Sequence, residues 1–163
     1  MAISVLFGVV AYSVNADSQG STSKADKPVE IVILDVYKSK TCGCCEGWIE
    51  HIEASNFQAN IHHPFDLNGV KVANGIKPGY ASCHTAISDN GYVFEGHIPA
   101  VIMKKFLANP PKDAIGLAVP GMPLGSPGME VGDRFSPYQV LVLNSDGTSR
   151  VFAEVRTAKE QYE

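Results

Sequence analysis

The sequence predicts an α/β domain in which a central mixed sheet carries flanking helices and an added C-terminal β-hairpin. An almost entirely apolar, β-branched run at 29–37 predicts a central strand buried on both faces. Directly after it, apolar residues recur at near-helical spacing among glutamates over 46–53, which predicts an amphipathic helix. Turn signals at 89–91 and 145–147 each separate two β-rich runs and predict hairpins.

The elements between the first helix and the first hairpin have weaker signals. Residues 57–61 predict a second strand, and 67–76 predict a second helix with an interrupted pattern. The first hairpin comprises strands at 82–88 and 92–95, which places Cys83 on a strand.

The C-terminal part of the chain begins with a third helix. Pro99 suits the first turn of this helix, which we expect over 100–108. A glycine- and proline-rich stretch at 116–132 predicts a long loop. The second hairpin then follows, with strands at 138–143 and 148–155.

Length, composition and charge limit the domain count and the partners. The chain has 163 residues, 45% of them hydrophobic, which is enough for one compact domain. Its formal net charge is −4 and its basic residues are scattered, so we expect neither nucleic acid nor an anionic membrane surface as a partner.

The N-terminal residues differ from the domain in composition. Residues 1–16 predict a signal peptide or an N-terminal anchor, because an apolar stretch ends in small residues typical of a cleavage site. The stretch is too short to span a bilayer comfortably as a helix. Residues 17–28 are polar and predict a flexible linker, which leaves 29–163 as the folded domain.

Cysteines carry the strongest functional signal. Three of the four lie within Cys42-Gly43-Cys44-Cys45, at the turn between the first strand and the first helix, and the fourth is Cys83. A cross-link between near neighbours removes little entropy from the unfolded chain, so such clustering is poorly suited to structural disulfides. The pattern indicates chemistry at the sulfur atoms.

Copper and zinc are the metals that suit this set of sulfurs. Cu(I) is a soft ion that favours thiolates and thioethers, and shared thiolates can bridge several Cu(I) ions. Zinc prefers four thiolates in a tetrahedron, usually from two Cys-x-x-Cys pairs, whereas this chain offers three cysteines on one side and one on the other. The spacing therefore favours copper, and zinc remains the alternative.

Two alternative roles of the cysteines that involve no metal remain open. One is a structural disulfide from Cys42 or Cys45 to Cys83. The other is a thiol-disulfide oxidoreductase that uses Cys42 and Cys45, in which one thiolate attacks a substrate disulfide and the second resolves the mixed disulfide. Cys44 would complicate that chemistry as a competing thiol.

Histidines and methionines can complete a copper site. His97 lies where a hairpin meets a helix, and its neutral imidazole can bind copper. Met122 and Met129 lie in the long loop and can supply thioethers. His84 follows Cys83 on a predicted strand, where successive side chains point to opposite faces, so we expect it to be structural.

The order of strand, cysteine turn, helix, strand, helix, hairpin and helix is that of the thioredoxin-like fold, and Cys42 to Cys45 has its Cys-x-x-Cys spacing. Four blocks resemble the CopG-type family of bacterial copper-resistance proteins. These blocks are Cys42-Gly43-Cys44-Cys45, Ser82-Cys83-His84-Thr85-Ala86, Glu95-Gly96-His97-Ile98-Pro99-Ala100, and Gly116-Leu117-Ala118-Val119-Pro120-Gly121-Met122-Pro123 with the Gly125-Ser126-Pro127-Gly128-Met129-Glu130 that follows.

The resemblance extends from about residue 29 to residue 155. It implies a thioredoxin-like domain exported to the periplasm, with copper bound through cysteines on two loops. It also implies cluster formation and copper redox cycling, and it makes copper ions and other periplasmic copper-handling proteins the expected partners. We expect metal binding rather than enzymatic catalysis, because no phosphate-binding loop, nucleophile elbow or metalloprotease motif is present in the sequence.

Overall fold

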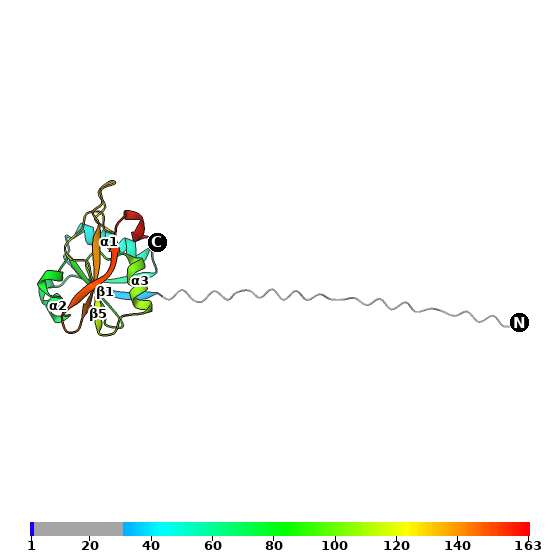
Figure 1. Ribbon diagram of the computed structural model, residues 1–163, viewed down its shortest axis with the longest axis horizontal. Coiled ribbons are helices and arrows are strands. Elements are labelled where there is room, and N and C mark those ends of the chain that lie inside the picture. Colours follow the sequence, from blue (N-terminus) through cyan, green and yellow to red (C-terminus); the bar gives the residue numbers. More distant parts are fainter. Residues whose placement is uncertain (2–30) are drawn as a thin grey trace.

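The structure is a computed structural model that describes Met1 and residues 31–163, so the predictions for 1–16 and 17–28 lie outside the described residues apart from Met1 (Figure 1). The described part is a mixed α/β fold with a seven-stranded sheet in the order β2-β1-β3-β4-β5-β6-β7. The strands are β1 (Val32–Lys38), β2 (Phe57–His62), β3 (His84–Ser88), β4 (Val93–Glu95), β5 (Ala114–Ala118), β6 (Tyr138–Asn144) and β7 (Ser149–Val155). The α-helices are α1 (Gly43–Glu53), α2 (Leu67–Ala73) and α3 (Ala100–Ala108), with short 3₁₀ helices η1 (Pro78–Tyr80) and η2 (Ala158–Gln161).

Strand pairing confirms the mixed sheet and the added hairpin. β1 pairs parallel with β2 and antiparallel with β3, and β3 pairs antiparallel with β4. β4 pairs parallel with β5, and β6 joins β5 and β7 in antiparallel ladders. The β6–β7 hairpin therefore extends the sheet beyond the elements that precede it.

The main core lies between the sheet and the pair of helices α1 and α3. Trp48 and Ile52 of α1 and Phe106 of α3 are completely buried there against alternate residues of the strands. In Figure 1, α2 lies on the other side of the sheet from α1 and α3. The second face carries only a small cluster, formed by Ile76, Val93, Ala118 and Leu143.

The prediction of a first strand buried on both faces is wrong. In β1, Leu34 and Val36 are completely buried, but the alternate residues Ile33, Asp35 and Tyr37 are only half-buried. Successive strand residues point to opposite faces, and the short helix α2 covers only part of the second face.

The sheet contains one strand, β5, that the sequence did not predict. The loop expected from residue 116 in fact begins after β5 (Ala114–Ala118). Glycine and alanine have low strand propensity, so pairing with β4 and β6 determines this strand rather than local sequence. Gly116 is needed there because a Cβ atom would lie 1.8 Å from the Val93 carbonyl oxygen.

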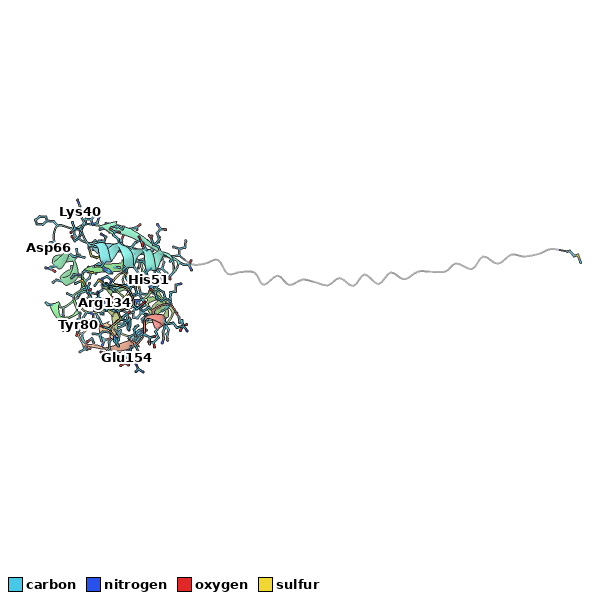
Figure 2. The ribbon with its side chains drawn as sticks, turned by 90° about the horizontal axis from the view of Figure 1, so that it is seen from above. Lys40, His51, Asp66, Tyr80, Arg134 and Glu154 are labelled. Carbon is cyan, nitrogen blue, oxygen red and sulfur yellow. A yellow bond between two sulfur atoms is a disulfide. The ribbon has the colours of Figure 1, made fainter. Side chains whose placement is uncertain are left out.

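The cysteine turn lies at the edge of the sheet where the parallel strands β1 and β2 end. Figure 2 shows Lys40, which follows β1, and Asp66, which follows β2, at the same end of the domain. His63 and the Lys38 carbonyl are within hydrogen-bond distance at 3.1 Å and link the two strand ends. Among the described residues, no helix is long and apolar enough to cross a membrane.

Protonation of His51 should lower the free energy of unfolding at acid pH. Burial lowers the pKa of His51 from its ordinary value of 6.5, although Glu130 opposes the shift. The Ala100 N–H donates to His51 Nε2 at 3.0 Å, so protonation of that nitrogen breaks the bond. The stabilisation by neutral His51 is complete above pH 6.5 and declines as pH falls below that value. We expect urea unfolding between about pH 8 and pH 5 to show that the free energy of unfolding falls less steeply in His51→Gln than in the wild-type protein. The glutamine amide oxygen can still accept the hydrogen bond but does not titrate. An equal loss in both proteins would contradict this role.

Candidate metal centre

The structure brings the four cysteine sulfurs together. Cys42 caps α1, Cys44 and Cys45 lie in its first turn, and Cys83 lies in the loop just before β3. All four sulfur atoms lie within 4.8 Å of one another. Cys83 Sγ is 3.5 Å from Cys45 Sγ and 3.9 Å from Cys44 Sγ. Two sulfurs that bind one tetrahedral ion through bonds of about 2.3 Å lie about 3.8 Å apart.

Two of these cysteines form a disulfide. Cys42 is bonded to Cys45, whereas Cys44 and Cys83 are free thiols. The structural disulfide considered from Cys42 or Cys45 to Cys83 is therefore not the pairing observed. Reduction by two electrons would release two further thiolates beside Cys44 and Cys83.

The surroundings of Cys83 favour its protonated, thiol form. Burial, followed by the neighbouring Cys44, raises the pKa of the Cys83 thiol to about 12. A bound metal ion would reverse this preference, because coordination deprotonates a thiol.

His97 lies against Cys83 as a ready nitrogen donor. The ring is buried, with Nε2 2.9 Å from Cys83 Sγ and Nδ1 2.7 Å from the Pro127 carbonyl oxygen. A carbonyl can only accept a hydrogen bond, so Nδ1 carries the proton and the lone pair of Nε2 points at the sulfur. Burial lowers the pKa of His97, which favours this neutral form.

The expectation that His84 points away from Cys83 is wrong. Because β3 begins at His84, the preceding residue does not follow strand alternation. His84 Nδ1 lies 3.4 Å from Cys83 Sγ, and the buried ring packs 4.2 Å from the Trp48 ring, measured between centroids. Burial, followed by the positive charge that His97 and Lys71 would place nearby, lowers the pKa of His84 well below its ordinary value. The adjacency of Cys83 and His84 was the signal in the sequence.

The loop with the two predicted methionine ligands contacts both sides of the site. Near Met122, Gly121 accepts a hydrogen bond from the Ser82 hydroxyl and donates one to Ala81. Met122 is 53% exposed and Met129 is half-buried. The loop is thus bonded to the residues beside Cys83, and both methionines remain proposed ligands.

Close packing of two glycines fixes the same loop against α1. A Cβ atom at Gly128, whose φ is +83°, would lie 2.3 Å from the Cys44 carbonyl oxygen and 2.5 Å from the Trp48 nitrogen. A Cβ atom at Gly47 would lie 3.0 Å from Gly128 Cα. This contact holds Pro127 where its carbonyl fixes the tautomer of His97.

Gly128→Ala should therefore disturb both stability and the site. We expect the free energy of unfolding to fall by about 2–5 kcal/mol, from the left-handed backbone and the steric clash together. Gly132→Ala is the matched control, because Gly132 has φ +56° with open space around a Cβ atom. Thermal or urea unfolding measures the loss of stability in each variant. Equal losses in Gly128→Ala and Gly132→Ala would contradict the packing argument.

A buried charged network supports the Cys83 loop, and the sequence analysis did not identify it. Glu95 is completely buried and accepts from Lys71 Nζ at 2.5 Å, from the Ser82 N–H at 2.6 Å and from the Thr85 hydroxyl at 2.6 Å. Lys71 Nζ also donates to Thr85 at 3.0 Å. Lys71 lies in a short helix and Glu95 in a strand, and no local pattern marks either as a buried partner.

A second buried lysine lies next to the cysteine turn. Lys38 is completely buried, and its Nζ lies 2.7 Å from Glu46 Oε1 and 3.0 Å from the Ser39 carbonyl oxygen. Both lysines are paired with carboxylates, so neither adds an unpaired positive charge near the sulfurs. The donors gathered here suit a soft metal ion.

Known proteins are similar to this chain in sequence and fold. The family model "Protein of unknown function, DUF411" matches residues 80–129. Two solved structures, "Copper resistance protein copG" in Form 1 and Form 2, are 43% and 44% identical to this chain. They cover 78% and 77% of this chain and 99% of their own chains, with TM-scores of 0.73. No curated protein matches the chain. At this identity and coverage, the chain belongs to the CopG family of copper resistance proteins.

Proposed function

We propose that this protein sequesters Cu(I) in copper resistance and homeostasis, as a cysteine-bridged multicopper cluster. The observation that carries the proposal is the convergence of the four cysteine sulfurs within 4.8 Å from two segments far apart in the sequence. The membership of the chain in the CopG family supports a role in copper handling.

The donor set favours Cu(I) over zinc. Cu(I) accepts low coordination numbers and bridging thiolates, and His97, Met122 and Met129 add soft or borderline donors around the cysteines. A zinc site built from cysteines alone needs four thiolates arranged as a tetrahedron around one ion, usually from two Cys-x-x-Cys pairs. This chain instead supplies three cysteines from one turn and one from a separate loop.

The redox state of the protein sets its copper capacity in this proposal. The reduced protein offers four thiolates, whereas the disulfide form offers only Cys44 and Cys83. Several Cu(I) ions held together also provide electrons that can be exchanged, so we include Cu(I)/Cu(II) cycling in the proposed function.

The fold and the location are also part of the proposal. The order β1-α1-β2-α2-β3-β4-α3 and the cysteines at the start of α1 support a thioredoxin-like arrangement. The composition of residues 1–16 supports export to the periplasm, where other copper-handling proteins would be partners.

A competition titration with a chromophoric Cu(I) chelator tests the binding proposal. Under anaerobic conditions, the fully reduced protein should take more than one Cu(I) per chain and the disulfide form distinctly fewer. Equal uptake by both forms, or no uptake by the reduced protein, would contradict it. Cyclic voltammetry of the loaded protein tests the redox part, which requires a reversible wave.

The disulfide favours a second candidate, a thiol-disulfide oxidoreductase. The bonded pair is Cys42–Cys45, the pair that such an activity would use. Reduction of a substrate disulfide should then depend on Cys42 and Cys45 and tolerate loss of Met122 or Met129. An insulin-reduction assay on those variants separates this candidate from copper storage.

A further inference from the structure

We propose that the exposed surface around Gly43 and Gly79 docks a methionine-rich segment of another protein, which delivers Cu(I) held on its thioethers. The inference rests on the proposed function in that this chain receives Cu(I), and it assigns no further metal ligand. The ion passes as Cu(I) with no electron transferred, and the cysteine thiols release their protons as they bind it.

Gly43 and Gly79 are glycines for which the fold gives no reason. Among the glycines within residues 31–163, only these two combine a φ outside the left-handed region with open space around a Cβ atom. Alanine would fit at both positions and would reduce the conformational entropy of the unfolded chain. Glycine also serves where another molecule must approach the backbone closely, and this explanation remains for both.

Both glycines lie in the two segments that carry the cysteines. Gly43 is the first residue of α1 and directly follows Cys42. Gly79 lies in η1, four residues before Cys83. The two glycines are exposed and the two cysteines are half-buried. A segment that approaches over these glycines therefore meets no side chain from either position on its way to the sulfurs.

The face of α1 that contains Gly43 is acidic. Glu46 and Glu50 follow Gly43 by three and seven residues, a spacing that places all three on one face of the helix. Both glutamates are exposed, and Glu50 has no ion-pair partner within residues 31–163. Cu(I) on neutral thioethers keeps its positive charge, whereas Cu(I) on two thiolates is anionic. The charge of this face therefore favours a segment that holds Cu(I) on methionines.

Phe65 gives the docking surface an apolar anchor. Its side chain is fully exposed. Figure 2 shows Asp66, the next residue, at the same end of the domain as Lys40 and Tyr80. Lys40 precedes the cysteine turn and Tyr80 follows Gly79. Aromatic side chains are typical anchors of protein partners, and a free ion or a small copper complex would have no use for one. The occupant is therefore a protein segment.

Stopped-flow transfer from two Cu(I) donors to the reduced full chain tests the proposal under anaerobic conditions. One donor is a short synthetic peptide with a central Met-x-x-Met sequence and no cysteine, and the other is the Cu(I) complex of a small chromophoric chelator. Gly43→Leu should slow transfer from the peptide at least about tenfold and change transfer from the chelator by less than about twofold, because only the peptide needs the space over the glycine. Gly43→Ala should raise the thermal midpoint of the metal-free protein by about 1–4 °C, and a lowered midpoint would show that this glycine serves the fold.

Two further variants test the charge and the anchor. Glu50→Gln should slow transfer from the peptide about two- to fivefold at low salt, and the difference should vanish in about 1 M salt, where charges are screened within a few ångströms. Phe65→Ala should slow it at least about fivefold. Val151→Ala, at an exposed apolar position of β7, is the matched control and should leave both transfer rates unchanged.

Equal slowing of both donors by Gly43→Leu overturns the proposal, because the open space would then serve the metal site itself. Failure of the peptide to transfer Cu(I) to the wild-type protein, or transfer that none of these variants slows, overturns it as well. Cu(I) uptake at equilibrium is measured in parallel by chelator competition. Uptake without the effects on the peptide refutes only the docking surface, whereas no uptake from either donor refutes the proposed function.

Discussion

Cys44→Ser should lower Cu(I) affinity at least about a hundredfold, which corresponds to about 2.8 kcal/mol at 1.4 kcal/mol per factor of ten. The hydroxyl is a poor ligand for Cu(I), and Cys44 Sγ lies 3.5 Å from Cys42 Sγ and 3.9 Å from Cys83 Sγ, between the two sides of the site. The number of bound coppers should fall as well. Chelator competition on the reduced protein measures both quantities.

The same variant separates the two candidate functions. Cys44→Ser leaves the Cys42–Cys45 pair in place, so an oxidoreductase should retain its disulfide-reducing activity. Ser39→Ala is a control in the same turn, because within residues 31–163 the exposed Ser39 hydroxyl bonds only to Thr41. Unchanged Cu(I) affinity in Cys44→Ser would show that the sulfurs do not act as one ligand set.

Glu95→Ala should strongly destabilise the protein. It leaves the buried Lys71 ammonium without its carboxylate and removes the acceptor of the Ser82 N–H beside Cys83. Breaking a buried ion pair from one side costs about 3–5 kcal/mol. Urea unfolding measures the loss, and the Lys71→Met/Glu95→Ala double variant should be less destabilised than the two single changes added together.

An exposed ion pair provides the control for this prediction. Lys159 and Glu163 form an i,i+4 pair with side chains 79% and 56% exposed. Lys159→Met should change the free energy of unfolding by less than about 1 kcal/mol, because solvent screens such pairs. If Glu95→Ala cost no more than Lys159→Met, the buried network would not support the Cys83 loop.

The sequence predicted the elements whose signals are local. The β-branched residues of β1, the apolar spacing in α1 and the Asn-Gly turn after β3 each depend on neighbours along the chain. β5 was missed because a strand with a central glycine depends on its partners in the sheet. The C-terminal hairpin was found because its turn residues determine it.

The sequence also predicted those parts of the candidate site that depend on residue type and spacing, but not those that depend on tertiary contacts. The cysteines and His97 were identifiable from residue type and spacing, and the structure brings them together. The contact between His84 and Cys83 was not predicted, because strand alternation applies only within a strand and Cys83 lies one residue outside β3. The ion pair of Lys71 and Glu95 depends on a tertiary contact between a helix and a strand.

Metal content by mass spectrometry, with free thiols counted in parallel, tests the central claim most directly. The protein would be purified anaerobically from copper-fed and from zinc-fed cells. We expect more than one copper per chain from copper-fed cells, with the thiols protected from alkylation. One zinc per chain, or no metal and a readily reducible disulfide, would contradict the claim that the cysteine cluster sequesters copper.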